Sequence, residues 1–457
     1  MFSAARDGDL ADNGYRRDLG NGLVLRWSSA KDTAGLVTLA GTVWRSESGK
    51  PPESTRMGRW TRELLSGRHP LIGPDGFALV EDTARGVIVA GACLLSEAWD
   101  YDGVTLPVGR PEIVATLPEY RRRGLVRAIF ELLHARSVAL GHSLQVITGI
   151  SWYYRQFGYT YAVGLAQGAG VPVSEIPPLA PGVDEPYTLR AATVADIPEL
   201  ARLYDEERTG ALVSTPISAE YWRWAIAGAD PLGDSFLLPW MLTGRAGAVA
   251  GYALTSLETH KGALRVDAVW LKRGLWLPAL PSLLRGLVPV GARLPGRHAG
   301  SLPFSSLAFS LPQTHPAQAA LRAFVNSPRD MDDAYAWYVR AHDLPALLRR
   351  LAPALERRLA ASPFAGYTGE LTVDLYRDAV RLVFADGRIT EVLARRAVAA
   401  SEPTVGIPPD VFPQLLFGYR DLRELRYAYP DVTVGGVARA LLPVLFPKRE
   451  SWALPLG

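Results

Sequence analysis

The chain has 457 residues, more than one hydrophobic core usually supports, so two or three domains are expected. Hydrophobic residues make up 48% and charged residues 21%, the balance of a soluble globular protein. The 49 basic residues stand among 46 acidic ones without a long basic run, which argues against a nucleic-acid partner. The N-terminus lacks the apolar core of a secretion signal, and Pro278, Pro281 and Arg285 interrupt the most apolar later stretch. We therefore expect no membrane span and a cytoplasmic location.

Cys93 is the single cysteine, which excludes an internal disulfide and a thiolate-rich metal site. It stands in the apolar run 87–95, where a buried strand residue is favoured over a nucleophile. The seven histidines show no ligand spacing, and the common metal, phosphate-loop and serine-nucleophile motifs are absent from the sequence. The sequence therefore predicts no metal.

In chain order, a flexible tail rich in Gly, Asp and Asn is predicted over residues 1–22. Strands and helices follow, and the clearest are three strands and one amphipathic helix, predicted over 87–95, 112–117, 144–148 and 122–140 respectively. Prolines and glycines then cluster over 167–186, which predicts a linker between two domains.

A short pattern occurs twice and predicts an internal repeat of a strand, a polar turn and a helix. The matching residues are Leu25, Arg26, Asp32, Leu36 and Leu39 in the first copy, and Leu189, Arg190, Asp196, Leu200 and Leu203 in the second. The alternative is that any two strand-turn-helix units of an α/β protein share such a pattern.

The last third of the chain differs in character. A long amphipathic helix is predicted over 336–359, with an interruption at Pro353. Three strands are then predicted over 370–375, 380–384 and 389–393, with short turns between them. Helical segments follow to the end, so this region is predicted to be a separate antiparallel α+β domain.

The segment 114–127 predicts an anion site, because a strand ends in a tight basic turn and a helix begins at once. The free N–H groups of a first helical turn and the positive end of the helix dipole attract anions. Gly124 lets a phosphate approach the backbone, and Arg121, Arg122 and Arg123 add charge-assisted donors. A solvated arginine run that caps a helix would fit these residues equally well.

Residues 121–126 resemble the coenzyme A pyrophosphate motif of the GCN5-related N-acetyltransferases (GNAT), with Val126 where a small residue is usual. Residues 154–159, Tyr-Arg-Gln-Phe-Gly-Tyr, are similar to the late aromatic-glycine segment of that family. With the repeat and the C-terminal module, the whole chain resembles the enhanced intracellular survival group.

The resemblance implies a mixed α/β and α+β fold made of three domains. Two GNAT domains stand in tandem, an N-terminal catalytic one over 23–166 and a degenerate one over 187–330. A domain similar to sterol carrier protein 2 follows over 335–457. The group also implies a homo-oligomer, often a hexamer.

The resemblance further implies acetyl-coenzyme A as cosubstrate and Tyr154 as general acid, although Tyr154 alone reads more easily as a core aromatic. The implied cofactor-binding residues are Val114, Ala115 and Thr116 along the pantetheine arm, Arg122, Arg123, Gly124, Leu125, Val126 and Arg127 at the pyrophosphate, and Gly149 and Ile150 near the thioester. The C-terminal carboxylate of Gly457 is the implied base, although the ending 452–457 departs from the group. Glu112 is the second candidate base.

The acceptor is expected to be a primary amine of a small molecule. Relatives that accept aminoglycosides carry Ser-Glu where this chain has Gly149 and Ile150, and Trp152 and Tyr153 add aromatic surface nearby. Such a lining suits a flatter or more apolar amine, so aminoglycosides are predicted to be weak substrates. Two alternatives are a lipid carrier with a non-catalytic acetyltransferase scaffold, and a protein lysine acetyltransferase.

The second GNAT-like domain is expected to have lost its cofactor site. Its comparable stretch keeps only Lys272-Arg273-Gly274 of the basic turn. Pro278 and Pro281 are predicted to disturb the helix that follows. A structural role is therefore predicted for this domain.

Overall fold

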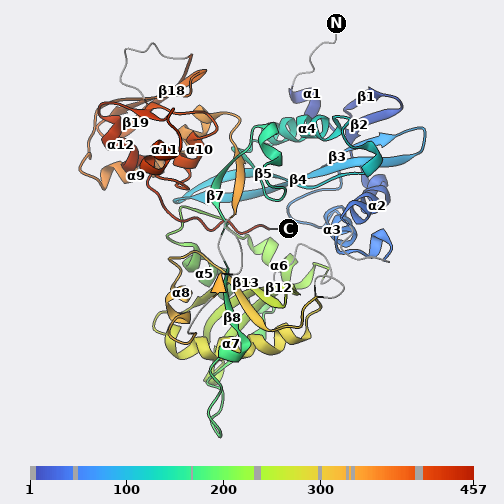
Figure 1. Cartoon of the computed structure of the whole chain (residues 1–457), viewed down its shortest axis with the longest axis vertical. Coiled ribbons are helices and arrows are strands. Elements are labelled where there is room, and N and C mark those ends of the chain that lie inside the picture. Colours follow the sequence, from blue (N-terminus) through green and yellow to red (C-terminus); the bar gives the residue numbers. More distant parts are fainter. Residues whose placement is uncertain are drawn as a thin grey trace.

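A computed structural model of the chain describes residues 7–44, 50–165, 168–230, 238–296, 301–325, 329–330, 335–396 and 405–456. Within these ranges the strands form three sheets of nine, seven and five strands. In Figure 1 the first sheet lies at the upper right, the second below it and the third at the upper left. The last described residues run between these three bodies. No helix in the described part of the chain is long and apolar enough to cross a lipid bilayer.

The first sheet has the order β1-β2-β3-β4-β5-β6-β16-β7, and β10 pairs with β4. Its strands are β1 (Arg16–Gly20), β2 (Leu23–Trp27), β3 (Phe77–Asp82), β4 (Val87–Tyr101), β5 (Val104–Thr116), β6 (Leu144–Ile147), β7 (Thr160–Gly164), β10 (Val213–Ser214) and β16 (Ala336–Arg340). Its helices are α1 (Asp7–Ala11), α2 (Thr33–Val43), α3 (Arg56–Leu64) and α4 (Leu125–Ala139). We call this sheet with helices α1 to α4 the first unit.

The second sheet has the order β15-β8-β14-β13-β12-β11-β9. Its strands are β8 (Gly168–Pro172), β9 (Tyr187–Ala191), β11 (Leu238–Gly244), β12 (Val249–His260), β13 (Ala263–Leu271), β14 (Ser306–Ser310) and β15 (Arg329–Asp330). Its helices are α5 (Ile197–Arg208), α6 (Ala219–Ala227), α7 (Trp276–Arg293) and α8 (Pro316–Leu321). This sheet with its helices is the second unit.

The two units repeat one topology and exchange a strand. The order β2-β3-β4-β5-β6-β16-β7 corresponds to β9-β11-β12-β13-β14-β8-β15, with helices inserted at equivalent places. Yet β8 follows β7 in sequence and pairs with β14 and β15, whereas β16 follows β15 in sequence and lies between β6 and β7. Each sheet is therefore completed by a strand adjoining the other unit. The stretch expected as a linker over 167–186 begins with β8, and the region expected to open the C-terminal domain at 335 supplies β16.

The predicted internal repeat is confirmed, because the matching arginine and aspartate side chains form the same hydrogen bonds in both copies. Arg26 donates to both carboxylate oxygens of Asp32, at 2.7 and 2.8 Å, and Arg190 does the same to Asp196 at 2.6 and 2.7 Å. Each aspartate also accepts from the backbone N–H three residues before it, closing a capping box. The shared pattern thus fixes the same strand-to-helix turn in both units.

The third sheet has the order β19-β18-β17-β20-β21 and belongs to the C-terminal part, residues 344–456. Its strands are β17 (Gly369–Asp374), β18 (Asp378–Ala385), β19 (Arg388–Arg396), β20 (Val405–Gly406) and β21 (Thr433–Val434). The helices are α9 (Leu344–Ala360), α10 (Phe412–Leu416), α11 (Leu422–Ala428) and α12 (Ala438–Leu445). The three strands predicted over 370–375, 380–384 and 389–393 are confirmed as β17, β18 and β19.

The helix predicted over 336–359 is wrong in its first part. Residues 336–340 form β16, and α9 begins only at Leu344, where Asp343 accepts from the N–H of Ala346. The first four residues of β16 are all buried, so the strand lacks the polar alternation that would distinguish it from a helix. Pro353 lies inside α9, which continues past it.

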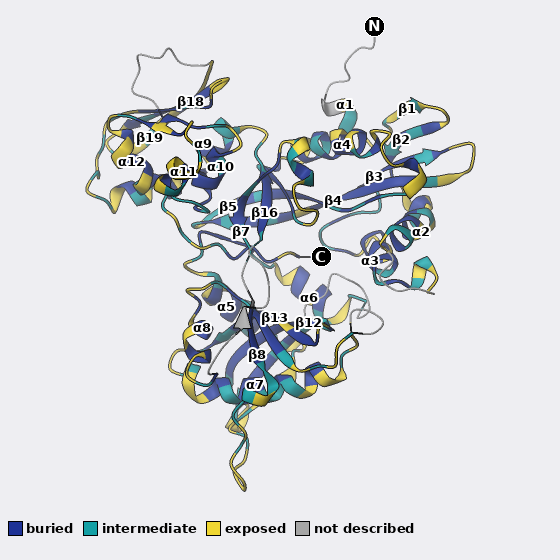
Figure 2. Cartoon of the chain, in the orientation of Figure 1, coloured by how far each residue is buried: buried dark blue, intermediate teal, exposed yellow. Residues whose placement is uncertain are grey.

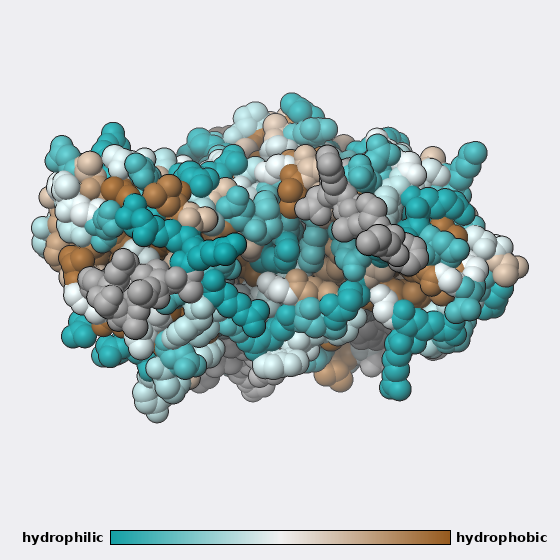
Figure 3. Space-filling view, turned by 90° about the horizontal axis from the view of Figure 1, so that it is seen from above, coloured by the Kyte–Doolittle hydropathy of each residue, from teal (hydrophilic) through white to brown (hydrophobic). Residues whose placement is uncertain are grey.

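The first unit and the C-terminal part share one hydrophobic core. Trp99 and Trp337 of the first sheet belong to the same buried cluster as Leu351 of α9 and Leu371 of β17. Figure 2 shows buried residues along the strands of all three bodies. Seen from above, the outer surface is largely hydrophilic, with hydrophobic side chains in small separate groups (Figure 3).

The exchanged strand predicts that the first unit depends on β16. Consider two shortened chains that omit the second unit: residues 1–165 joined by a flexible linker to 335–456, and the same chain joined to 344–456. The first keeps β16 between β6 and β7, and the second leaves both strand edges open. We expect that only the first of these two chains shows a cooperative thermal transition by circular dichroism. Equal melting of both would contradict the assigned role of β16.

Candidate active site

The turn between β5 and α4 presents a free helix N-terminus. Gly124 precedes α4 with φ +74°, a left-handed conformation that favours glycine, and a Cβ there would meet no atom within 4 Å. The first helical hydrogen bond runs from the N–H of Ala128 to the carbonyl of Gly124. The N–H groups of Leu125, Val126 and Arg127 therefore have no acceptor within the helix. These three residues border a pocket, so the backbone conformation suits an anion.

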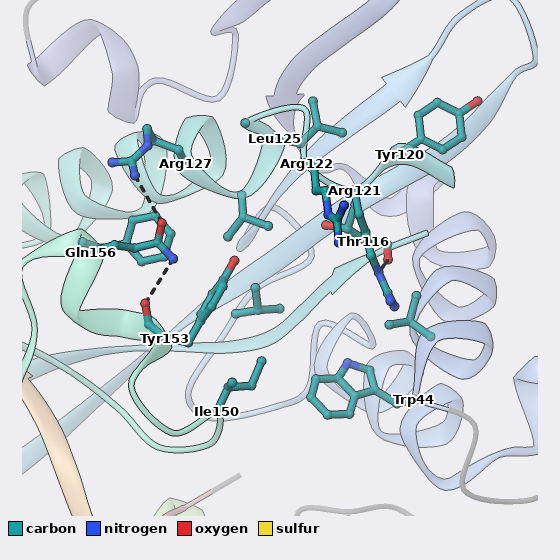
Figure 4. A pocket seen from close by; sticks show the side chains of 15 residues that line it. Trp44, Thr116, Tyr120, Arg121, Arg122, Leu125, Arg127, Ile150, Tyr153 and Gln156 are labelled. Atoms are coloured by element: carbon teal, nitrogen blue, oxygen red, sulfur yellow. Dashed lines mark hydrogen bonds between the residues drawn. The ribbon is translucent and has the colours of Figure 1, made fainter. Parts of the chain in front are cut away.

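This pocket has a volume of about 690 Å³ and lies between α4, β5 and the ends of α2 and β6 (Figure 4). Its lining combines basic and aromatic side chains, and Arg127 lies over the Phe157 ring at 5.4 Å. The lining residues are Val43, Trp44, Val114, Thr116, Tyr120, Arg121, Arg122, Gly124, Leu125, Val126, Arg127, Ile150, Tyr153, Gln156 and Phe157. In Figure 4 Arg121 and Arg122 lie on one side of the pocket and Tyr153 lies near its middle.

The arginines of the basic turn have different surroundings. Arg122, at φ +62°, lines the pocket, and no hydrogen bond from it to another described residue is formed. Arg123 is not among the lining residues: it donates to the carbonyl of Glu119 at 2.9 Å and lies over the Tyr120 ring at 4.9 Å. Arg127 lines the pocket and donates to Gln156 at 3.2 Å. All the residues expected to bind the pyrophosphate except Arg123 therefore line this pocket.

A separation of strands opens the other half of the pocket. β5 and β6 pair at Val108–Leu144 and Gly109–Gln145, and a bulge in β5 follows at Ile113, where φ is +51°. Beyond the bulge, the side chains of Val114 and Thr116 line the pocket. Ala115, expected along the pantetheine arm, is buried, pairs with Gly91 of β4 and is not among the lining residues.

The two adjacent tyrosines take different positions. Tyr153 lines the pocket, whereas Tyr154 is 4% exposed and packs against Phe130 and Tyr338. A Cβ on Gly149, which has φ +114°, would lie 3.9 Å from the Tyr154 hydroxyl. Burial, and next the negative charge of Glu112, raise the pKa of Tyr154 above its usual value. The Tyr154 hydroxyl forms no hydrogen bond with any described residue, so it is available as a donor.

Sequence reasoning missed Tyr335, which precedes β16. Its hydroxyl donates to the carbonyl of Gly149 at 2.6 Å. The adjoining Ile150 is 46% exposed and lines the pocket. Because Tyr335 is 186 residues from Gly149 in sequence, only the strand exchange reveals this contact.

A buried charged group was also missed. Arg110 lies 3.5 Å from Glu97 and 3.6 Å from Glu112, and Arg110 and Glu97 are fully enclosed. Burial raises the pKa of the Glu97 carboxyl from 4.5 to about 7, although the nearby Arg110 opposes this shift. The available sequence signal was three charged residues at inward positions of two otherwise apolar strands.

Glu97 predicts a pH-dependent stability. Because its pKa is higher in the folded chain, folding is favoured by its proton at low pH, and this contribution is lost as the pH rises from 4.5 through 7. The Glu97→Gln variant has no carboxyl to ionise at this position. Its free energy of unfolding, relative to that of the wild type, should therefore rise between pH 5 and pH 8 by about 3 kcal/mol at most. Thermal melts at both pH values measure this, with Glu131→Gln on α4 as the matched removal of a carboxylate. A pH-independent difference would contradict it.

The expected base, Gly457, lies outside the described residues. The preceding tail runs between the two units: Trp452 forms a bridge with Ser214, and the Trp337 indole donates to the carbonyl of Ala453 at 3.0 Å. Leu456 is buried beside residues of α5 and α6. The role of the terminal carboxylate stays a prediction. Glu112, the second candidate, has a side chain 20% exposed near Tyr154.

The second unit lacks the features of this site at the equivalent turn. Lys272 is paired with Glu199 at 2.7 Å, and Pro278 offers no N–H in the first turn of α7. The predicted disturbance of the helix is wrong, because α7 runs from Trp276 to Arg293 with Pro281 inside it. The described residues contain no cluster of three or more His, Cys, Asp or Glu side chains placed to bind a metal ion.

Comparisons with known proteins identify one domain and show a similar overall fold. Residues 26–162 match the family model of the acetyltransferase (GNAT) domain. The fold is similar to a GCN5-related N-acetyltransferase from Kribbella flavida, with TM-score 0.61, 16% identity and coverage of 95% of this chain and 100% of that chain. A GCN5-related N-acetyltransferase from Anabaena variabilis has a TM-score of 0.62 and 14% identity, with coverage of 94% of this chain and 99% of that chain. Eis1 from Mycobacterium abscessus has a TM-score of 0.53 and 16% identity, with coverage of 94% of this chain and 99% of that chain. No curated protein matches the chain.

Proposed function

We propose that the chain is an acetyl-coenzyme A-dependent N-acetyltransferase that modifies a primary amine of a small molecule. The N-terminal part of the chain contains a GNAT acetyltransferase domain, and the mixed α/β fold class is confirmed. The observation that carries the proposal is one pocket lined by a free helix N-terminus, by Arg121, Arg122 and Arg127 and by Tyr153, with the buried Tyr154 ring packed against Tyr153. Likeness of 335–457 to sterol carrier protein 2 and assembly into a homo-oligomer stay predictions.

The residues present fit coenzyme A. The N–H groups of Leu125, Val126 and Arg127, together with the Arg122 guanidinium, would hold the pyrophosphate. The edge of β5 at Val114 and Thr116 would hold the pantetheine arm. Bound in this way, the cosubstrate supplies a thioester whose carbonyl carbon an amine attacks.

The side chains near the strand separation have the chemistry that such a transfer needs. Backbone N–H groups beside the β5 bulge are candidates for stabilising negative charge on the carbonyl oxygen. Glu112, partly exposed, is a candidate to accept a proton from the attacking amine, directly or through water. The Tyr154 hydroxyl, protonated because burial raises its pKa, is the donor proposed for the departing thiolate.

Release of the coenzyme A thiol from acetyl-coenzyme A tests the proposal across arylamines, polyamines, aminoglycosides and lysine peptides. We expect release with a small primary amine and weaker release with aminoglycosides. Preferred acetylation of the lysine peptides would show that the acceptor is a protein lysine and not a small molecule. No binding of acetyl-coenzyme A by calorimetry would overturn the proposal.

A further inference from the structure

The second unit contains a pocket of about 860 Å³ in the place that corresponds to the cofactor pocket of the first. The first pocket is bordered by the end of α2, the end of β5 and the segment after β6. The second is bordered by the equivalent elements: the end of α5, Trp270 near the end of β13, and residues 312–316 after β14. Its remaining wall comes from Gly164 and Leu165 at the end of β7 in the first unit, from Tyr335, Gly418 and Tyr419, and from residues 448–451 near the C-terminus.

Coenzyme A does not fit this second pocket. The turn from the end of β13 to Gly274 has two residues, whereas seven separate the end of β5 from Gly124. The N–H of Val269, two residues before the end of β13, donates to the carboxylate of Glu207 at 3.0 Å. The corresponding position in β5 is Val114, which borders the cofactor pocket. The Glu207 carboxylate therefore already accepts from the backbone N–H of β13 that corresponds to the N–H of Val114 in β5.

Two carboxylates, those of Glu207 and Glu450, line the pocket together with the cations Lys448 and Arg449. Among the described residues Glu207 accepts from Tyr252 and Val269, and His315 Nε2 lies 3.1 Å from it but is poorly aligned for a hydrogen bond. His315 Nδ1 accepts from the N–H of Ala317. The two hydrogen bonds that Glu207 accepts within the described part of the chain come from a hydroxyl and a backbone N–H.

Glu450 lies at the exposed rim of the pocket. Glu450 accepts from the N–H groups of Gln313 and Thr314 and from the Thr314 hydroxyl, all neutral donors. The two cations of the lining have carboxylate partners outside it: Lys448 contacts Glu424 at 2.6 Å, and Arg449 contacts Asp102 at 2.8 Å, which Arg358 also contacts at 2.8 Å.

Aromatic side chains complete the chemistry of the pocket, because Trp270, Tyr335 and Tyr419 all line it. Aromatic rings attract organic cations, and a nearby carboxylate adds to that attraction. We infer that this pocket binds a small organic cation with an aromatic or apolar body. Glu207, which is fully enclosed, acts through its field, whereas Glu450 at the rim is exposed to the ligand.

Tyr335 joins this pocket to the site of the first unit. It lines the second pocket, and its hydroxyl donates to the carbonyl of Gly149, beside Ile150 of the first pocket. Through this hydrogen bond, a cation that contacts Tyr335 would change the affinity for acetyl-coenzyme A. The coupling, unlike the binding, rests on the proposed function.

Binding is tested with benzyltrimethylammonium, a quaternary cation without an N–H that cannot be acetylated, titrated calorimetrically into the full chain without acetyl-coenzyme A. We expect saturable binding, about tenfold weaker for the neutral isostere neopentylbenzene and about tenfold weaker in Trp270→Ala. Glu450→Gln should weaken it about threefold. Tyr419→Leu serves as the second variant if Trp270→Ala fails to fold. Equal binding of the isostere, or binding lost in Tyr153→Ala but kept in Trp270→Ala, overturns the assignment.

Coupling is tested by the KM for acetyl-coenzyme A with saturating benzyltrimethylammonium. We expect a change of about fivefold or more in the wild type and none in Tyr335→Phe, which keeps the ring but loses the bond to Gly149. Because the binding experiment needs no turnover, failure of the cation site and failure of the proposed acetyl transfer give different results. Binding without any change in KM would overturn the coupling.

Discussion

Tyr154→Phe is expected to lower kcat for acetyl transfer by about 100-fold or more, with little change in the KM for acetyl-coenzyme A. The substitution keeps the ring that packs against Phe130 and Tyr338 and removes only the hydroxyl, which forms no hydrogen bond with a described residue. Stability should therefore change little, and the loss should fall on proton transfer to the departing thiolate. Steady-state release of the coenzyme A thiol, with a thermal melt of both proteins, measures each part.

Tyr153→Phe is the matched control, since it removes the neighbouring hydroxyl from a ring that lines the pocket. We expect its effect mainly on KM, because Tyr153 lies where the cosubstrate would pass and not beside Gly149. If Tyr153→Phe lost kcat and Tyr154→Phe did not, the general acid would be Tyr153.

The pH profile gives a further check on Tyr154. Its pKa lies above the usual value near 10, so the phenol stays protonated and able to donate at any lower pH. Wild-type kcat should therefore show no loss between pH 7 and about pH 9.5 from ionisation of this group. A descending limb in that interval that disappears in Tyr154→Phe would show a lower pKa than the structure gives.

The sequence predicted those parts of the site that local geometry determines. The turn at Gly124 and the start of α4 follow from residues adjacent in the chain, as does the paired repeat of Arg26 with Asp32 and Arg190 with Asp196. In each case a strand end, a turn and a helix start are encoded within about ten residues. Such short-range signals need no knowledge of distant partners.

The parts that the sequence did not predict depend on long-range pairing. β16 looks helical in isolation because both of its faces are covered, one by the shared core around Trp337 and the other by the aromatic cluster around Tyr338. The contact from Tyr335 to Gly149 exists because β16 crosses back from the second unit. Likewise, the burial of Glu97 and Arg110 requires the whole assembly of both strands, and no local pattern specifies their pairing.

Arg122→Ala is expected to raise the KM for acetyl-coenzyme A by about 10- to 100-fold, while kcat at saturation stays within a few-fold of the wild type. A charged hydrogen bond contributes about 1.5–3 kcal/mol, and one pyrophosphate contact would be lost in ground state and transition state alike. Arg122 lines the pocket and forms no hydrogen bond to another described side chain or carbonyl, so its removal should leave the fold intact.

Arg123→Ala separates this specific role from the general effect of positive charge. It removes the same charge one residue away, from a side chain that donates to Glu119 and lies over the Tyr120 ring, outside the pocket lining. We expect its KM to change less than about threefold, because an exposed charge at that distance is screened. Equal effects of the two substitutions, measured by steady-state kinetics at two ionic strengths, would mean that the turn attracts the cosubstrate by its net charge. Unequal effects would instead place the pyrophosphate between Arg122 and the first turn of α4.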